Sequence, residues 1–265
     1  MSVVVIGSSG LLGATLAAQH DVISLSRTQC DITDPVSIVT MFGWYKPDIV
    51  INCAGIVPKA EEQAGIMQTL RVNALGPKIL REVCEEYGAR LVHISTNCIF
   101  KGHSGGYLED SIPNPADMYG MSKHLGEVTD APHLTVRTSF VGLPDAGTRG
   151  LLLWAKKQKV LIGYDKLFWN GLTTNELGSI LFNVLIPQKV TGIVHLHGET
   201  VSKYDLLVRA KEILGWETEI VKESDIEGLK EPHIGDQTLG SFYPEYQTAK
   251  TVRDMLREMK EQNGL

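Results

Sequence analysis

The chain has 265 residues, 43% of them hydrophobic, and carries a formal net charge of −6 at pH 7. That length fits one large domain, or one domain with a smaller appendage, and the acidic balance excludes a basic footprint for nucleic acid or for an anionic membrane. The N-terminus enters an apolar run without a basic leader, and no stretch approaches the roughly 20 apolar residues of a membrane span, so we expect a cytoplasmic protein with neither a nucleic-acid nor a membrane partner.

Short apolar runs alternate with longer amphipathic stretches, a pattern typical of βαβ units. The runs lie at residues 3–6, 22–25, 49–54, 91–95 and 134–138. A sixth run at 193–197 follows a predicted helix at 173–185 and is expected to join the same sheet as a late strand. The alternation predicts an α/β fold with a doubly wound parallel sheet and helices on both of its faces.

A glycine-rich turn follows the first predicted strand. In GSSGLLG, Gly7, Gly10 and Gly13 stand three apart and open the next predicted helix. Glycine lets the backbone turn tightly and approach a pyrophosphate, which the unpaired N–H groups of a helix N-terminus can bind. The spacing differs from GxGxxG, so a strand-to-helix turn without a ligand is the alternative, but the strand–turn–helix context favours a dinucleotide site.

The end of the second predicted strand carries the residue that selects the dinucleotide. Arg27 stands twenty positions after Gly7, where an acidic residue would bind a ribose 2′-hydroxyl and an arginine can hold a 2′-phosphate. Arg27 therefore favours NADP over NAD, although an ordinary solvated arginine is nearly as well supported. We place Asp31 and Ile32 at the adenine edge; the alternative is that Asp34 merely caps the next helix.

Small residues end the third predicted strand at Cys53, Ala54 and Gly55, as close packing against a cofactor requires. Packing of a helix alone would also select small residues there. Asn73, in the following predicted helix, is a candidate for holding a backbone kink or a water near the site, although a lone asparagine on a helix is more often a surface residue.

The central pattern is HISTNCIF, residues 93–100, which follows the apolar start of the fourth predicted strand. It delivers Ser95 and Thr96 to the edge of the sheet at which open α/β folds bind their ligands.

The segment NPADMYGMSKHLGEV, residues 114–128, predicts a helix capped by Asn114. Tyr119 and Lys123 are four residues apart, so both side chains lie on one helix face. A phenol, an ammonium and the hydroxyl of Thr96 that converge at a strand end can move a proton to or from a carbonyl oxygen.

The later half of the chain offers fewer chemical signals. Trp169 precedes the polar turn NGLTT and is a candidate for stacking on a sugar or a base, although such an aromatic is as often part of the core. His195 and His197 alternate along one predicted strand without further ligands nearby, so we expect a structural pair and no metal site. The four cysteines form no CxxC pair, so neither a disulfide framework nor a zinc site is indicated.

The motifs GSSGLLG, CDITD, NCAG, VNALGP, ISTNCIFKG, YGMSK and RTSFVG occur in an order that resembles the extended short-chain dehydrogenase/reductases, and within them the dTDP-4-dehydrorhamnose reductase group. The likeness covers essentially the whole chain and is strongest over its first half. It implies a Rossmann-like NAD(P)-binding domain of residues 1–140 plus about 171–196. A smaller C-terminal substrate-binding lobe would take residues 141–170 plus about 197–265.

The resemblance also implies a role for each member of the trio Thr96, Tyr119 and Lys123. A tyrosine matching Tyr119 gives its proton to a ketone oxygen as the nicotinamide delivers hydride to the carbon. A lysine matching Lys123 binds the nicotinamide ribose and lowers the pKa of the phenol, and a Ser/Thr matching Thr96 hydrogen-bonds the same oxygen. The alternative is an inherited fold in which these are ordinary residues, because fold alone does not prove activity.

Departures from the family pattern bear on the substrate. Asn97 and Cys98 stand where rhamnose-type reductases usually carry an Asp-Tyr pair, so a substrate contact is missing and the identity of the sugar stays open. They also cannot serve as the Asp-Glu acid and base of the sugar 4,6-dehydratases, which argues against a dehydratase. The segment 223–241 lacks the Arg-Ser-Leu-type run that relatives often show before the final helix.

We therefore predict an NADP-preferring reductase of a keto group, expected at C4, on a nucleotide-activated deoxysugar. The alternatives are a non-catalytic NADP-binding subunit that regulates a partner enzyme and a nucleotide-sugar epimerase; NAD and a homodimer also stay open. The candidate residues are, for catalysis, Thr96, Tyr119 and Lys123; for cofactor binding, Gly7, Ser9, Gly10, Leu11, Leu12, Arg27, Asp31, Ile32, Cys53, Ala54, Gly55, Asn73, Tyr119 and Lys123; and for substrate binding, Val57, Asn97 and Trp169.

Overall fold

The computed structural model describes residues 1–143, 150–226 and 235–264. The chain divides into two compact units: unit 1 is Met1–Ile99, Pro113–Arg137 and Gln188–Val194, and unit 2 is Phe100–Ile112, Thr138–Pro187 and His195–Leu265. Residues 100–112, 138–140, 171–187 and 195–196 thus group with unit 2, whereas we expected them in the cofactor-binding domain. This division rests on contacts within the chain and not on bound ligands, so the predicted roles of the two domains stay predictions. No helix in the described ranges has both the length and the apolar character that crossing a bilayer needs.

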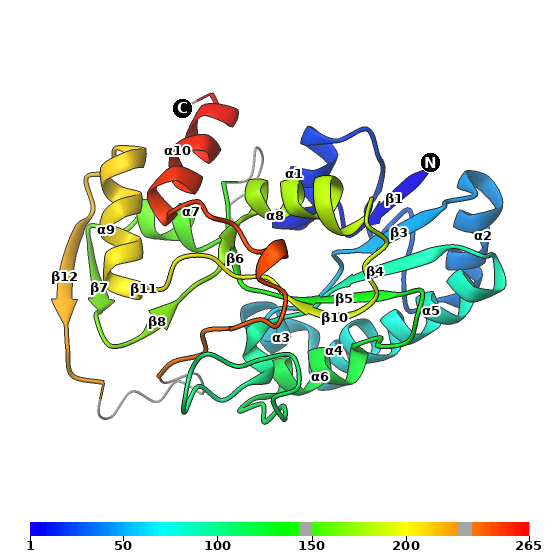
Figure 1. Ribbon diagram of the computed structural model, residues 1–265, viewed down its shortest axis with the longest axis horizontal. Coiled ribbons are helices and arrows are strands. Elements are labelled where there is room, and N and C mark those ends of the chain that lie inside the picture. Colours follow the sequence, from blue (N-terminus) through cyan, green and yellow to red (C-terminus); the bar gives the residue numbers. More distant parts are fainter. Residues whose placement is uncertain (144–149, 227–234, 265) are drawn as a thin grey trace. The chain divides into compact units, whose positions relative to one another are not determined.

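A six-stranded sheet forms the centre of unit 1, in the order β10-β5-β4-β3-β1-β2 (Figure 1). Along β2, β1, β3, β4 and β5, each strand pairs in parallel with the next. Each of the six apolar runs supplies one strand, so the predicted α/β fold is confirmed. The strands are β1 (Val3–Ile6), β2 (Ile23–Leu25), β3 (Ile49–Asn52), β4 (Arg90–Ile94), β5 (Leu134–Arg137) and β10 (Gly192–His195).

Helices cover this sheet, with α1 above it and α5 and α6 beneath it in Figure 1. Strands β1 and β3 are buried along their whole length, as expected for parallel strands covered on both faces. The helical elements of unit 1 are α1 (Leu11–Gln19), α2 (Pro35–Tyr45), α3 (Pro58–Ala64), α4 (Ile66–Leu70), the π-helical turn η1 (Arg71–Leu75), α5 (Gly76–Glu86), the 3-10 turn η2 (Asn97–Ile99) and α6 (Met118–Gly126).

Helix α6 begins later than the sequence predicts. Its N-cap is Asp117, whose carboxylate accepts a hydrogen bond from the Gly120 N–H at 2.7 Å. Asn114 instead donates its backbone N–H to the Ile99 carbonyl at 2.9 Å, which holds the preceding segment outside the helix. The prediction that Asn114 caps this helix is therefore wrong.

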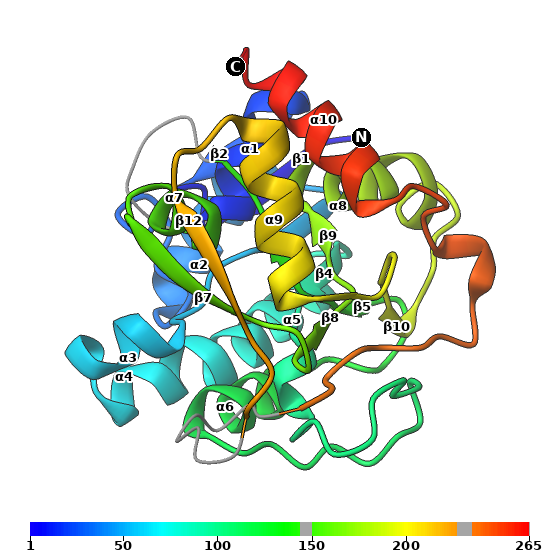
Figure 2. The ribbon, with the colours of Figure 1, turned by 90° about the vertical axis from the view of Figure 1, so that its left-hand side faces the viewer.

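The described part of unit 2 contains three two-stranded pairs: β11 with β8, β12 with β7, and β6 with β9. Figure 2 shows α9 alongside β7 and β12. The helix predicted at 173–185 is present as α8 and the π-helical turn η3. The elements are β6 (Phe140–Val141), α7 (Leu151–Lys156), β7 (Val160–Tyr164), β8 (Phe168–Trp169), β9 (Leu172–Thr173), α8 (Thr174–Ile180), η3 (Leu181–Leu185), β11 (Val201–Ser202), α9 (Lys203–Leu214), β12 (Glu219–Glu223), the 3-10 turn η4 (Pro244–Tyr246) and α10 (Val252–Gln262).

Candidate active site

The three predicted catalytic residues meet at the C-terminal end of β4, all within unit 1. Thr96 follows this strand and is 6% exposed. Its side chain is close enough to Tyr119, which lies in the first turn of α6, to lower the pKa of that phenol. Lys123, one turn further along the same helix, donates from Nζ to the carbonyl of Ile94 at 2.7 Å. The strand end and the helix thus gather a hydroxyl, a phenol and an amine.

The Tyr119 phenol keeps its proton at neutral pH. Burial raises the pKa of Tyr119, nearby Cys98 and Asp117 raise it further, and the side chain of Thr96 opposes them. The resemblance implied a pKa lowered by the lysine, and these surroundings act in the opposite direction. A phenol that holds its proton is suited to donate it to a developing alkoxide.

Lys123 is the group of the trio that titrates near neutral pH. Its side chain is 5% exposed, and burial lowers the pKa of Lys123 to about 8, while the charges of Glu127 and Cys53 oppose the shift. Its Nζ also lies 3.3 Å from Nε2 of His93, a fully buried histidine of β4.

A buried ion pair that we did not predict from the sequence lies beside the trio. The carboxylate of Glu127, directly after α6, accepts hydrogen bonds from Arg137 at the end of β5 and from the hydroxyl of Ser95. His93 and Asn52, which contact each other in neighbouring strands, were missed as well. Asn52, His93 and Arg137 share one signal, a polar residue within an otherwise apolar strand run, and that signal could have identified them.

Asn73 is fully buried in the π-helical turn η1 and all of its amide is engaged. Its Oδ1 accepts from the N–H of Ile56 at 2.7 Å, and its Nδ2 donates to the Ile56 carbonyl at 2.8 Å and to the Ser122 hydroxyl at 3.0 Å. Asn73 therefore ties the loop after β3 to helix α6, and a direct contact with the cofactor stays a prediction.

The glycine turn leaves no room for side chains. A Cβ on Gly7, whose φ is +89°, would lie 2.6 Å from the backbone N of Ala54, and a Cβ on Gly13 would lie 2.3 Å from the Gly7 carbonyl oxygen. The turn therefore packs directly against Cys53 and Ala54. Gly10, the N-cap of α1, makes no side-chain cap, so the first N–H groups of α1 can bind an anion. This turn fits a pyrophosphate.

The other predicted members of the dinucleotide site surround this turn. Ser9 is exposed, Leu11 is half-buried, and the Leu12 side chain is buried, so Leu12 can offer only its backbone. Gly55 is exposed in the loop after β3.

The end of β2 lies next to the glycine turn, because the N–H groups of Gly7 and Ser8 both donate to the Leu25 carbonyl. Arg27, two residues later, has a 68% exposed side chain whose Nε lies 3.4 Å from Oδ2 of Asp31. Both are thus available to a ligand at this end of the sheet. Ile32 is only 4% exposed, and its side chain contacts Gly76, so the Ile32 side chain is core. Asp34 does cap α2, accepting from the Val36 N–H at 3.0 Å.

The substrate candidates are divided between the units. Val57, half exposed before α3, and Asn97, in η2, belong to unit 1. Trp169 belongs to unit 2, is 8% exposed, and donates its Nε1–H to the Ser139 hydroxyl at 2.9 Å, so it has a structural role in its own unit. Residues 227–234 of the segment 223–241 lie outside the described residues. His195 is buried, and its Nδ1 lies 2.9 Å from the Tyr107 carbonyl, as expected for a structural histidine.

One group of metal-ligating types lies close together among the described residues: Glu85, Asp130 and His133, within 4.8 Å of one another. The Nδ1 of His133 accepts the backbone N–H of Leu91 at 3.1 Å, so the neutral ring carries its proton on Nε2, the atom that faces Glu85. Arg81 already pairs with both carboxylates. A protonated nitrogen and two carboxylates that already share an arginine do not fit a metal ion.

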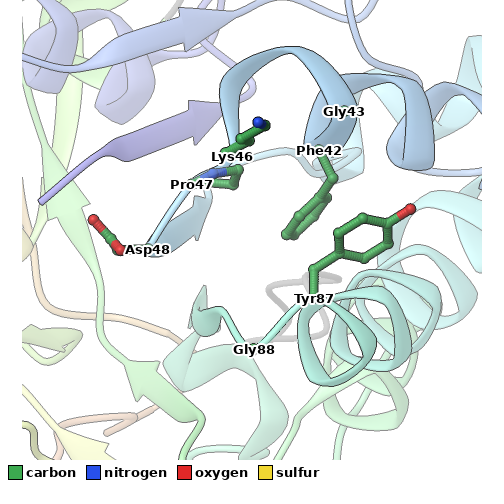
Figure 3. Close-up of a pocket in the computed structure, with 7 residues that line it drawn as sticks. All are labelled: Phe42, Gly43, Lys46, Pro47, Asp48, Tyr87 and Gly88. Atoms are coloured by element: carbon green, nitrogen blue, oxygen red, sulfur yellow. The ribbon is translucent and has the colours of Figure 1, made fainter.

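A hollow of about 350 Å³ lies at the opposite, N-terminal edge of the strands (Figure 3). Its residues precede β3 and β4, far along each strand from Thr96. The rings of Phe42 and Tyr87 pack against each other along one side of it, with their centroids 5.1 Å apart. Tyr87 in this hollow is therefore a tyrosine remote from Thr96, Tyr119 and Lys123. The lining residues are Phe42, Gly43, Lys46, Pro47, Asp48, Tyr87 and Gly88.

The family described as RmlD substrate binding domain matches residues 1–225 of the chain. A dTDP-4-keto-6-deoxy-D-glucose reductase of Streptomyces niveus is 35% identical over 129 residues, which cover 46% of this chain and 45% of that protein. The spore coat polysaccharide biosynthesis protein SpsK of Bacillus subtilis is 29% identical, with 87% of this chain and 86% of the relative covered. A dTDP-4-dehydrorhamnose reductase of Streptomyces griseus is 29% identical, with 72% and 68% covered.

Solved structures extend the likeness to the whole chain. A dTDP-4-dehydrorhamnose reductase of Clostridium acetobutylicum superposes with a TM-score of 0.86 at 24% identity and covers 100% of both chains. A dTDP-4-dehydrorhamnose reductase of Bacillus anthracis, solved in complex with NADP, superposes with a TM-score of 0.84 at 20% identity, covering 99% of this chain and 100% of the other. At these identities the likeness shows the fold.

Proposed function

The chain belongs to the RmlD substrate binding domain family, and from this premise we propose that it is an NAD(P)H-dependent reductase of a keto group, expected at C4, on a nucleotide-activated deoxysugar. Relatives named dTDP-4-keto-6-deoxy-D-glucose reductase and dTDP-4-dehydrorhamnose reductase support this substrate class. The first of them is matched over less than half of its length, so the activity rests on the site as well as on the names.

The observation that carries the proposal is the placement of three groups at one strand end: Thr96 follows β4, the buried Tyr119 lies in the first turn of α6, and Lys123, one turn further along, donates to the Ile94 carbonyl of β4 at 2.7 Å. The nicotinamide, when bound, supplies the hydride. Tyr119 donates its hydroxyl proton to the ketone oxygen, and Thr96 orients that oxygen through its own hydroxyl. The ketone becomes an alcohol, the dinucleotide is oxidised, and the phenolate recovers a proton from solvent.

NADP is the cofactor that the charged residues favour. Arg27 stands at the end of β2 next to the glycine turn, where its guanidinium can pair with a 2′-phosphate. The NADP complex of the Bacillus anthracis relative supports the same choice. Unit 1, which holds the glycine turn and the trio, is proposed to bind the dinucleotide, and unit 2 to contribute to the substrate lobe. The cytoplasmic location and a homodimer stay predictions from the sequence.

A panel of dTDP- and UDP-linked 4-keto sugars, assayed by NADPH oxidation, tests the function. We expect turnover of at least one sugar by the wild-type protein and a loss of about 10²- to 10⁴-fold in Tyr119→Phe, with NADPH binding nearly unchanged. Tyr87→Phe, in the remote hollow of Figure 3, is the matched control and should keep full activity. Full activity in Tyr119→Phe would overturn the catalytic assignment.

The same assay separates the two alternatives. A wild-type protein that binds NADPH but reduces no sugar on the panel would favour the regulatory subunit. Purification with a tightly held dinucleotide, together with a changed sugar configuration and no net NADPH consumption, would favour an epimerase.

A further inference from the structure

A continuous chain of hydrogen-bonding contacts runs from the end of β3 to the amine of Lys123. The backbone N–H of Ala54 donates to Asn52 Oδ1 at 3.0 Å, and Asn52 Nδ2 lies 3.2 Å from His93 Nδ1. His93 Nε2 lies 3.3 Å from Lys123 Nζ, which donates to the Ile94 carbonyl at 2.7 Å. Asn52 and His93 stand directly opposite each other in β3 and β4 and are both fully buried. Solvent therefore does not decide which atoms donate.

The direction of this chain follows from its first contact. Because Asn52 Oδ1 accepts the Ala54 N–H, the atom turned toward the histidine is the amide nitrogen, which only donates. Burial, followed by the charges of Lys123 and Lys78, lowers the pKa of His93 well below its ordinary range, so the imidazole is neutral. A neutral imidazole has one N–H and one lone pair. With the lone pair of Nδ1 facing Asn52, the proton is on Nε2 and points at Lys123.

A nitrogen that receives a hydrogen bond needs a lone pair, and this requirement selects between the two states of the lysine. A neutral amine has a lone pair for the His93 Nε2–H and still donates to Ile94. An ammonium has three donors and no acceptor. When Lys123 is charged, either two donors face each other at Nε2, or the ring moves its proton to Nδ1 and loses the contact with Asn52. The ammonium form of Lys123 therefore makes one buried hydrogen bond fewer than the neutral amine form.

We propose that Asn52 and His93 are positioning residues that hold Lys123 between amine and ammonium, so that the lysine exchanges a proton during the reaction instead of remaining a fixed cation. This inference rests on the proposed function for its consequence, because there Lys123 acts beside Tyr119. The part of the inference that does not depend on the proposed function concerns only the protonation states of His93 and Lys123.

Three further groups face this pair from other elements. Glu127 of the segment after α6 favours the ammonium by its negative charge. Cys53, after β3, has a thiol pKa raised by burial to about 12. The thiol is therefore uncharged at neutral pH and does little there to raise the pKa of Lys123. Lys78 of α5 faces His93 and disfavours a charged imidazole. Burial and the hydrogen-bond chain act together against the ammonium, and Glu127 acts for it.

Nuclear magnetic resonance on the protein without added ligand tests the inference. The ¹⁵N shifts of the His93 ring identify its tautomer, and the Lys123 Nζ signal, assigned by its loss in Lys123→Arg, is followed as a function of pH. We expect the Nε2–H tautomer in the wild type above pH 8, where Lys123 is the neutral amine. In Asn52→Ala the ring is free to move its proton to Nδ1, so we expect Lys123 to titrate higher by roughly one pH unit. Asn170→Ala, which removes a buried asparagine that braces the Leu239 backbone in unit 2, is the matched control and should leave Lys123 unchanged.

An Nδ1–H tautomer in the wild type above pH 8, where Lys123 is neutral, would overturn the inference, and this measurement needs no variant to fold. An Nε2–H tautomer with an unshifted lysine in Asn52→Ala would overturn the coupling equally. Neither readout uses substrate or cofactor. A protein that fails the sugar panel can therefore still show the predicted tautomer, and an active reductase with the other tautomer would refute this inference alone.

Discussion

The guanidinium of Arg137 binds the carboxylate of Glu127 through two contacts, Nε to Oε1 and Nη2 to Oε2, both of 2.8 Å. Both side chains are 3% exposed, and the Ser95 hydroxyl donates to the same Oε1 at 2.8 Å. Glu127 directly follows α6, and Ser95 directly precedes Thr96. The pair therefore ties the end of the helix that carries the phenol and the amine to the strand end that carries the catalytic hydroxyl.

Removal of one partner of this pair should strongly destabilise unit 1. In Arg137→Met the Glu127 carboxylate stays buried without the arginine that makes two of its contacts, and we expect a loss of about 3–5 kcal/mol in the free energy of unfolding. Urea denaturation at pH 7 measures it. Arg257→Met, whose arginine side chain is 60% exposed, is the control and should change stability by no more than about 0.5 kcal/mol. A loss below about 1 kcal/mol in Arg137→Met would show that the Glu127–Arg137 pair does not stabilise the contact between the end of α6 and the end of β4.

The glycine turn should tolerate no methyl group at Gly13. The Cβ of Gly13→Ala would lie 2.3 Å from the Gly7 carbonyl oxygen, so the backbone of the turn must shift. We expect a stability loss of about 1–3 kcal/mol and weaker NADPH binding. Gly43→Ala in α2 meets nothing within 4 Å and should instead stabilise by up to about 1 kcal/mol. Urea unfolding and NADPH titration of both variants compare them, and equal behaviour of the two would contradict the packing argument.

The sheet of unit 1 could be predicted because its strands are buried on both faces and read as unbroken apolar runs, such as Val3–Ile6. The meeting of Thr96 with Tyr119 followed from the same reasoning, since strand ends and the helices after them share one edge of the sheet. The start of α6 could not be predicted. Asn114 and Asp117 are equally good caps, and only the hydrogen bond from Asn114 to Ile99, fifteen residues away, decides between them.

The polar contacts around the trio lay beyond the reach of sequence patterns for a different reason. Glu127 and Arg137 are ten residues apart, and their pairing depends on β5 lying beside β4. Asn52 and His93 are forty-one residues apart and meet through the register of β3 with β4. Each member looked like an isolated polar residue until the sheet brought its partner alongside.

Arg27 should discriminate between the two dinucleotides. Its guanidinium lies at the end of β2 beside the glycine turn, so Arg27→Ala should weaken NADPH binding by about tenfold and leave NADH binding unchanged, because only NADPH carries the 2′-phosphate. Fluorescence titration with each dinucleotide measures both constants. Arg257→Ala removes another exposed arginine and should affect neither. An equal loss for both dinucleotides in Arg27→Ala would assign the residue to another part of the cofactor.

The rate of ketone reduction should fall at alkaline pH because Lys123 loses its proton before Tyr119 does. Burial lowers the pKa of Lys123 to about 8 and raises the pKa of Tyr119, so the ammonium is present below about pH 8 and the acidic phenol persists above it. If the ammonium is required, kcat/KM for NADPH-dependent reduction should be level below pH 8 and fall about tenfold per unit above it. In Asn52→Ala this alkaline limb should move up by roughly one unit, while Asn170→Ala should keep it in place whatever its effect on the rate. A limb that stays at pH 8 in Asn52→Ala, or a wild-type rate that is flat to pH 10, would remove Lys123 from control of the reaction.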